Sequence, residues 1–279
     1  MLLAVLQGAS ELFPVSSLGH TVLVPALLHW HVNRSDPTFL AFIVALHLGT
    51  ALALVAFYRR EWVGIVRGLI ASVVRGRIGN DGEERTAWLL VVGTIPVAIL
   101  GVLFEGPVRA LFGSTALVAL FLMINGIIMF IGERLKRMER RAAQGPPRRL
   151  ERLPWSAALG VGLAQSLALF PGISRSGSSI VAGLLWDLTH EDAARYSFLL
   201  ATPAIGAASI LEIPRLLDPH AHVVLLESFV GGLLSAVTAY ASVAFLTRYF
   251  RTNDLRPFGW YCVLAGAVAF GLAVAKVIS

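Results

Sequence analysis

The chain alternates between long apolar runs and short stretches that carry most of its charged residues. Because an α-helix needs about 20 apolar residues to cross a bilayer, we predict six membrane-spanning helices. One of these runs is short and contains Pro203, so we expect it to extend toward Arg195 or to be kinked. The six predicted spans are 37–58, 87–105, 113–133, 198–211, 223–247 and 257–277.

Two other apolar stretches are interrupted in the middle by proline and small polar residues. Residues 1–29 are broken at FPVSSLGH, and residues 155–190 are broken at FPGISRSGSS. Each half has only about 13 to 17 residues, too few to cross a bilayer at a rise of about 1.5 Å per residue. We therefore predict four half-helices, arranged as two re-entrant hairpins.

The two hairpins resemble each other in sequence. VLQGASELFPVSS at 5–17 aligns without gaps with GLAQSLALFPGIS at 162–174. Each half of the chain reads as a hairpin followed by three spans, and an odd number of crossings inserts the second half upside down. The predicted fold is an all-α polytopic membrane protein with six transmembrane helices and two re-entrant hairpins in an inverted-topology repeat. This single domain, 1–279, comprises a first repeat at 1–133, a cytoplasmic linker at 134–153 and a second repeat at 154–279.

The composition supports a membrane protein and excludes several other classes. With glycine counted and tyrosine left out, about 63% of the residues are apolar, against about 45–50% in soluble domains. The single cysteine, Cys262, excludes a disulfide framework within the chain and any CxxC metal or redox motif. The residues after Met1 lack the basic region and cleavage site of a signal peptide, so we expect them to belong to the mature fold. Only six residues precede Gln7, which leaves open whether the chain has its full start.

The basic residues are divided unequally between two sets of loops. Eighteen Lys and Arg fall in 59–86, 134–153, 190–197 and 248–256, and three fall in 30–36, 106–112 and 212–222. Because basic loops stay in the cytoplasm, we predict that the first set is cytoplasmic and that both termini face the periplasm or exterior. The same distribution accounts for the net charge of +6, so we do not expect nucleic acid as a partner.

Few ionisable side chains interrupt the apolar segments, where they are costly unless they serve a function. Ser16 and Ser174 can cap the half-helices that follow the breaks, which leaves unpaired backbone N–H groups at two helix starts. Such helix starts bind anions, and an arginine adds a planar fork that suits phosphate oxygens. We therefore predict a shared polyanion pocket where the two breaks meet. The ionisable residues are Glu11, His20, His47 and Arg175.

Helical spacing places three pairs of these side chains on common faces: Gln7 with Glu11, Ser17 with His20, and Arg175 with Ser179. Other interpretations stay open. The serines of the breaks, Ser16, Ser176 and Ser178, suit close helix packing as well as ligand binding. Glu11 and Arg175 are alternatively a buried structural ion pair. His47 fits a packed core histidine or a partner of the site better than a ligand.

Three motifs resemble the undecaprenyl-diphosphate phosphatase family, which is linked to bacitracin resistance. They are QGASELFPVSSLGH at 7–20, PGISRSGSSI at 171–180 and EDAARYSFLLATPAIGA at 191–207. The resemblance follows the order and hydropathy of nearly the whole chain. It implies a phosphatase of the bacterial inner membrane that hydrolyses undecaprenyl diphosphate to undecaprenyl phosphate and inorganic phosphate. The product is the lipid carrier of cell-wall synthesis.

The resemblance also implies roles for individual residues. The family's (Glu/Gln)-x-x-x-Glu pair falls on Gln7 and Glu11, and its PGxSRSxxT motif falls on Pro171 to Ser179. This chain departs from the pattern by the neutral Gln7, by Leu18 in place of serine or threonine, and by Ser179 in place of threonine. A divalent cation, Mg²⁺ or Ca²⁺, is implied and would depend on Glu11, with Gln7, phosphate oxygens and water. The catalytic residues implied are Glu11, Ser17, His20 and Arg175, and the phosphate ligands are Ser16, Ser174, Arg175, Ser176 and Ser179.

Two reaction routes agree with these residues. In one, Ser17 attacks the terminal phosphate while His20 takes its proton and Glu11 orients His20 or holds the metal. In the other, water attacks directly and Ser17 is only a phosphate ligand. The alternative function is a polyprenyl-phosphate flippase that uses the same anion pocket without hydrolysis. Whether the chain forms a homodimer stays open, as does the preferred lipid chain length.

Overall fold

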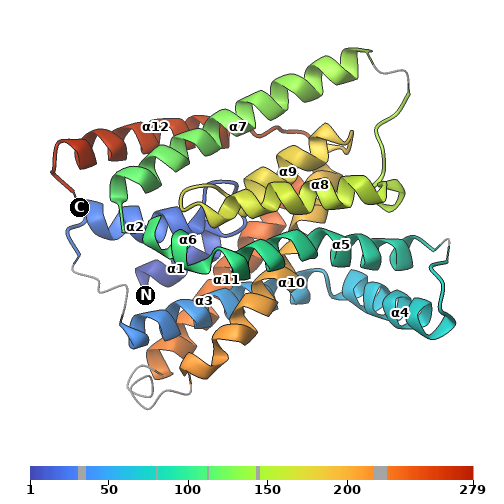
Figure 1. The fold of residues 1–279 in the computed structure, drawn as a ribbon, viewed down its shortest axis with the longest axis horizontal. Coiled ribbons are helices and arrows are strands. Elements are labelled where there is room, and N and C mark those ends of the chain that lie inside the picture. The colour runs from blue at the N-terminus through green and yellow to red at the C-terminus, as the bar shows by residue number, and fades with distance from the viewer. Residues whose placement is uncertain (31–35, 80, 112, 143–144, 217–224, 279) are drawn as a thin grey trace.

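The computed structural model describes residues 1–30, 36–79, 81–111, 113–142, 145–216 and 225–278, and this part of the chain forms helices and no β-strand (Figure 1). Among the described residues, five helices are long and apolar enough to cross a membrane. The prediction of an all-α, multi-pass membrane protein is confirmed. The five helices are α3 (Pro37–Phe57), α5 (Gly82–Leu103), α7 (Thr115–Ala142), α11 (Leu225–Tyr249) and α12 (Arg256–Val274).

The run predicted at 198–211 belongs to a longer helix, α10 (His190–Leu216). It has 27 residues, begins before Arg195 and continues through Pro203. The expected extension toward Arg195 is therefore present. Its first turn carries Glu191 and Asp192, and Arg195 follows one turn later.

Three stretches predicted as loops contain helices, and these predictions were wrong. The basic stretch after residue 58 forms α4 (Arg59–Arg75), and residues after 104 form α6 (Glu105–Leu111). The predicted linker from residue 134 continues α7 as far as Ala142. Arginine, leucine and alanine are strong helix formers. A count of basic residues locates a segment outside the membrane but does not distinguish a helix from a loop.

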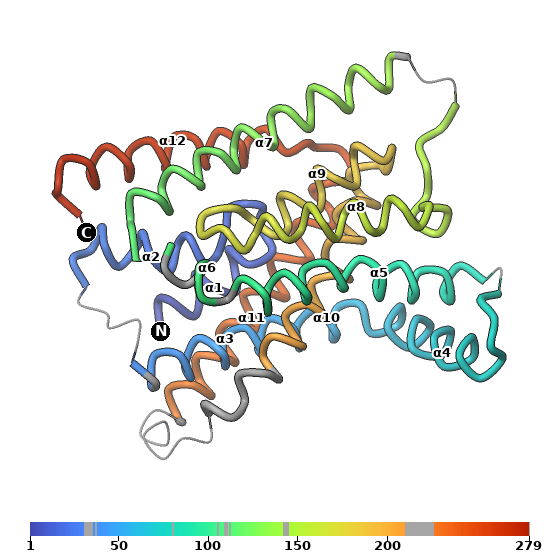
Figure 2. Tube along the Cα trace, in the orientation of Figure 1, coloured from blue at the N-terminus to red at the C-terminus, as the bar shows by residue number. Residues whose placement is uncertain are grey.

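Each interrupted apolar stretch forms two short helices with a break between them. The first pair is α1 (Leu2–Ser10) and α2 (Ser17–Leu27). The second pair is α8 (Trp155–Gln165), which ends in the 3₁₀ turn η2 (Ser166–Leu169), and α9 (Arg175–Leu185). Figure 2 shows the two hairpins entering the helix bundle from opposite ends, with their closed ends in its middle. The predicted half-helices are present, and their re-entry into a bilayer stays a prediction.

Helices of the two halves pack against each other in equivalent pairs. Helix α1 of the first half packs against α11 of the second, and α8 of the second packs against α5 of the first. Both contacts are close, because a Cβ atom on Gly8 would lie 2.2 Å from Ser235 O and one on Gly162 would lie 2.4 Å from Gly93 O. Helix α3 also packs against α10, and α7 against α12. These reciprocal contacts support an inverted repeat.

Charged side chains join several helices at one end of the bundle, on the right in Figure 1. We call it the basic end; it comprises residues 59–79, 134–142, 145–153, 186–195 and 250–256. Arg195 on α10 pairs with Glu61 at 2.8 Å and with Glu151, in the 3₁₀ turn η1 (Leu150–Arg152), at 3.0 Å. Asp187 pairs with Lys136 at 2.7 Å. Burial alone would raise the pKa of Asp187, but Lys136 and Arg140 hold it below its ordinary value.

Candidate active site

Glu11 is the first residue of the first break, directly after the end of α1, and several side chains contact it. Its Oε2 accepts hydrogen bonds from Gln7 Nε2 at 2.9 Å and from Ser17 Oγ at 2.5 Å. The Glu11 residue is only 8% exposed, and Gln7 is fully buried. The shared face predicted for Gln7 and Glu11 is confirmed. The carboxylate is thus held against the hydroxyl of the first residue of α2.

Ser16 ends the first break in an unusual backbone conformation. Its φ is +67°, in the left-handed region that a residue with a Cβ atom rarely adopts. Its hydroxyl accepts a hydrogen bond from Gly19 N at 3.2 Å, so Ser16 caps α2 as predicted. Strained positions of this kind cost about 1–3 kcal/mol and cluster at functional sites.

The second break has the same cap, but one more residue separates it from the Phe-Pro pair that both breaks share. Ser174 caps α9 by accepting from Gly177 N at 3.1 Å, as predicted. Gly172 in this break has a φ of +109°, and a Cβ atom there would lie 2.3 Å from Val118 O. Because the caps are Ser16 and Ser174, the ungapped alignment is out of register by one residue at this point. Ser17 and Arg175 therefore occupy the same position, the first residue of α2 and of α9.

Asn125 on α7 joins the two breaks, and sequence reasoning missed it. Its Nδ2 donates to Pro14 O at 3.0 Å, and its Oδ1 accepts from Ser174 N at 3.0 Å. Ser176 adds a second link by donating to Phe13 O at 3.1 Å. An amide in the middle of the apolar run 113–133 was the available signal. The breaks are therefore bonded to each other, directly and through one buried side chain.

Arg175 brings a positive charge from the second break to the carboxylate of the first. Its Nη2 lies 3.6 Å from Glu11 Oε1, an ion pair too long for a hydrogen bond. Its Nη1 donates to Ser197 O at 3.3 Å. Nε and Nη2 are buried and have no hydrogen-bond partner among the described residues. A purely structural pair leaves few such donors, so this guanidinium is suited to binding phosphate oxygens.

His47 on α3 completes the buried cluster around Gln7. Its Nδ1 lies 2.9 Å from Ile43 O, and its Nε2 lies 3.1 Å from Gln7 Nε2 and 3.7 Å from Glu11 Oε2. In the neutral tautomer protonated on Nδ1, Nε2 accepts from the Gln7 amide. His47 is therefore a partner of the site, one of the two interpretations left open by the sequence.

The oxygen atoms near Glu11 can be compared with the needs of a divalent cation. Gln7 Oε1 is buried and has no hydrogen-bond partner among the described residues. It and the Glu11 carboxylate are oxygen donors of the kind that Mg²⁺ and Ca²⁺ prefer. Within the described part of the chain, no group of three His, Cys, Asp or Glu could hold a metal. The oxygen atoms of Gln7 and Glu11 fit a cation that takes its other ligands from phosphate and water.

His20 does not contact Ser17, which differs from the expected proton transfer between them. Its Nδ1 lies 2.7 Å from Ser16 O, and its Nε2 lies 2.7 Å from Tyr261 Oη. The two rings are stacked with centroids 5.7 Å apart. Helical spacing predicted the common face, but the carbonyl one turn earlier and Tyr261 on α12 engage both ring nitrogens. Glu11, not His20, is the group bonded to the Ser17 hydroxyl.

The hydroxyls of the remaining serines near the second break form hydrogen bonds within the protein. Ser178 Oγ donates to Arg175 O at 3.1 Å. Ser179 Oγ donates to Arg175 O at 2.7 Å and lies 2.7 Å from Ser197 Oγ. With Ser16 and Ser174 engaged as caps, the packing interpretation describes these hydroxyls well. Their role as phosphate ligands stays a prediction.

Replacement of Ser179 is expected to affect stability more than catalysis. Ser179→Ala removes neutral hydrogen bonds and should cost about 1 kcal/mol of stability and less than about threefold in kcat/KM. Ser179→Thr keeps the hydroxyl and should be tolerated. The measurements are steady-state phosphate release and thermal unfolding of both variants beside wild type. A loss of at least about tenfold in kcat/KM for Ser179→Ala would place this hydroxyl on the substrate.

The chain is similar to known proteins over nearly its whole length. A model of the family described as bacitracin resistance protein BacA matches residues 1–268. Undecaprenyl-diphosphatase 2 of Chromobacterium violaceum is 47% identical over 274 residues, which cover 96% of this chain and 95% of that protein. Undecaprenyl-diphosphatase 2 of Burkholderia ambifaria and undecaprenyl-diphosphatase 1 of Burkholderia pseudomallei are each 47% identical over 270 residues, 96% of this chain and 94% of theirs.

Proposed function

The chain belongs to the bacitracin resistance protein BacA family, and from this premise we propose that it hydrolyses undecaprenyl diphosphate to undecaprenyl phosphate and inorganic phosphate. The relatives named undecaprenyl-diphosphatase support this substrate. The observation that carries the proposal is the meeting of Glu11, Ser17 and Arg175 where the two breaks join. A base, a hydroxyl and a guanidinium with free hydrogen-bond donors are groups that phosphoryl transfer uses.

The cationic part of the site binds and stabilises the transferred phosphoryl group. Arg175 offers Nε and Nη2, and the starts of α2 and α9 add the positive ends of two helix dipoles. In the loose transition state, charge is spread over the three equatorial phosphoryl oxygens. Fixed donors in a buried site are therefore stabilising where the reaction needs them.

Glu11 is the proposed general base. As Ser17 Oγ attacks the terminal phosphorus, its proton passes to Glu11 Oε2, and the bond to the bridging oxygen breaks to release the polyprenyl monophosphate. Glu11 gives this proton to the leaving monophosphate, water then attacks the phosphoserine and gives a proton to the ionised Glu11, and Glu11 returns it to Ser17 Oγ as inorganic phosphate leaves. In the direct route, Glu11 deprotonates water and Ser17 binds phosphate. Both routes depend on Glu11, and His20 and Tyr261 hold the start of α2 in place.

We propose Mg²⁺ or Ca²⁺ as the cofactor. Glu11 and Gln7 Oε1 would hold the ion, and His47 fixes the Gln7 amide by accepting from Nε2. A hard cation bound there supplies neutralisation of the charge on the diphosphate. The neutral Gln7 gives this pair one charge fewer than two carboxylates would.

We place the protein in the bacterial inner membrane with the basic end in the cytoplasm and the site opening toward the periplasm. The unequal count of basic residues supports this orientation. Part of the less basic set, including Arg34, His220 and His222, lies outside the described residues.

Cysteine labelling tests the orientation. In a Cys262→Ala background, Thr252→Cys at the basic end should be protected from an impermeant thiol reagent in intact cells, because this end is cytoplasmic. Gly113→Cys, exposed at the opposite end, should be labelled. Both should react after the cells are permeabilised. The reverse pattern would contradict the orientation.

Release of phosphate by the purified protein tests the function. In detergent with Mg²⁺ or Ca²⁺, a C55 or C15 polyprenyl diphosphate should yield one inorganic phosphate per lipid, and EDTA should abolish the release. Adding the cation back should restore it. If no divalent ion supports release, the flippase alternative replaces the phosphatase. Full release in EDTA would remove the cofactor from the proposal.

A further inference from the structure

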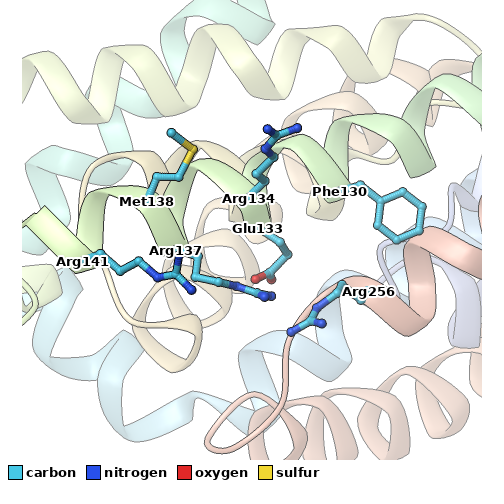
Figure 3. Close-up of a pocket in the computed structure, with 7 residues that line it drawn as sticks. All are labelled: Phe130, Glu133, Arg134, Arg137, Met138, Arg141 and Arg256. Atoms are coloured by element: carbon cyan, nitrogen blue, oxygen red, sulfur yellow. The ribbon is translucent and has the colours of Figure 1, made fainter.

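A groove unrelated to the breaks lies at the basic end, between the last turns of α7 and the start of α12 (Figure 3). Seven residues line it: Phe130, Glu133, Arg134, Arg137, Met138, Arg141 and Arg256. Four of the seven are arginines and one is acidic. No lining residue belongs to the proposed active site.

The positive charge of this groove is largely unpaired. Arg134, Arg137 and Arg141 are exposed, and their side chains make no hydrogen bond or ion pair with the described residues. Arg195 and Arg140, at the same end, are both paired. Three unpaired guanidinium groups on one helix repel each other, so the groove favours an anion.

The acidic side chain of the groove does not neutralise these arginines. Glu133 Oε1 already accepts from His190 Nε2 at 2.8 Å and from Leu255 N at 2.9 Å, and the residue is buried. Arg256 pairs with Asp254 at 2.7 Å. Figure 3 shows the Glu133 carboxylate between the side chains of Arg137 and Arg256. The groove therefore keeps a net positive charge.

One edge of the groove is apolar and aromatic. Phe130 packs against Trp260 with ring centroids 5.0 Å apart, and Trp260 is 58% exposed. Tryptophans of membrane proteins are enriched at the level of the lipid headgroups. From Phe130, Arg134, Arg137 and Arg141 follow along α7 over about 16 Å at 1.5 Å per residue. The groove thus changes from apolar at the membrane to cationic outside it.

We propose that this groove binds the phosphate headgroup of an anionic phospholipid of the adjoining leaflet. The arginines contact the phosphate, and an acyl chain lies along Phe130 and Trp260. Basic pockets between transmembrane helices on the cytoplasmic side bind lipid headgroups of this chemistry. The proposal does not depend on the hydrolysis reaction, because it rests on other residues at another place in the fold.

Lipid binding to the full-length protein tests the proposal. Delipidated protein in a neutral detergent is titrated with phosphatidylglycerol or phosphatidylcholine, and bound lipids are counted by native mass spectrometry. Wild type should bind its first phosphatidylglycerol at least about tenfold more tightly than phosphatidylcholine, because the arginines attract the anionic headgroup. Arg134→Gln/Arg137→Gln/Arg141→Gln should lose this preference, and Arg137→Gln alone should reduce it.

A matched control removes the same charge from the same end. Arg60→Gln/Arg67→Gln/Arg77→Gln changes three exposed, unpaired arginines of the α4 region and should keep the preference. An equal loss in both triple variants would show general attraction and overturn the proposal. Retention in the groove variant would also overturn it. Competition by millimolar inorganic phosphate would indicate a site for free phosphate, and preference seen only in dimers would indicate an interface between two chains; either would contradict the proposal.

Discussion

Glu11→Gln is expected to lower kcat/KM for phosphate release by at least about a hundredfold, the usual contribution of a general base. Glutamine has nearly the same size and keeps an oxygen that can accept from Ser17 and Gln7. It cannot take the proton from the attacking oxygen, and it is a weaker ligand for a divalent cation. The measurement is steady-state phosphate release from a polyprenyl diphosphate by the purified variant.

Glu133→Gln is the matched control for this change. Glu133 is also a buried glutamate that accepts two hydrogen bonds, but it lies next to the basic end, away from the breaks. Its replacement should leave kcat/KM within about threefold of wild type, which corresponds to less than about 0.7 kcal/mol. If Glu11→Gln kept near-wild-type activity, or lost no more than Glu133→Gln, the proposed base would be wrong.

Arg175→Lys should reduce kcat/KM by at least about tenfold, about 1.4 kcal/mol of transition-state binding. Lysine keeps the charge but lacks the planar fork that binds two phosphoryl oxygens. If Arg175 served only to balance Glu11, the ammonium group would preserve most of the activity. The variant should insert and purify normally, and its kcat/KM is measured with thermal stability in parallel.

Arg195→Lys provides the comparison for Arg175→Lys. Arg195 is a partly buried arginine paired with two glutamates at the basic end, and its substitution should affect stability but not turnover. Near-wild-type turnover in Arg175→Lys, or a loss that follows only a fall in Tm, would return the Glu11–Arg175 pair to a structural role.

Much of the helical architecture could be predicted from the pattern of apolar residues. The predicted span 37–58 corresponds to α3, and prolines and small polar residues located both breaks. The pattern did not predict α4, because a helix outside the bilayer can carry many arginines. The one-residue difference between the breaks was also hidden, since only the backbone shows that Ser16 and Ser174 are equivalent caps.

The candidate site was predictable where its residues are close in sequence. Gln7, Glu11 and Ser17 lie within one hairpin, and their ionisable or polar character in an apolar stretch identified them. Asn125 and Tyr261 reach the breaks from α7 and α12. Their contacts depend on how distant helices pack, which no local spacing specifies. For the same reason, the hydrogen bond between His20 and Tyr261 could not be predicted.

A double-mutant cycle on kcat/KM tests most directly whether the two breaks form one active site. It compares wild type, Glu11→Gln, Arg175→Lys and the double variant in the phosphate-release assay. Because Glu11 and Arg175 are in contact at 3.6 Å, the loss in the double variant should be smaller than the product of the two single losses by at least about threefold. Losses that multiply would contradict the account, because the two residues would then act independently.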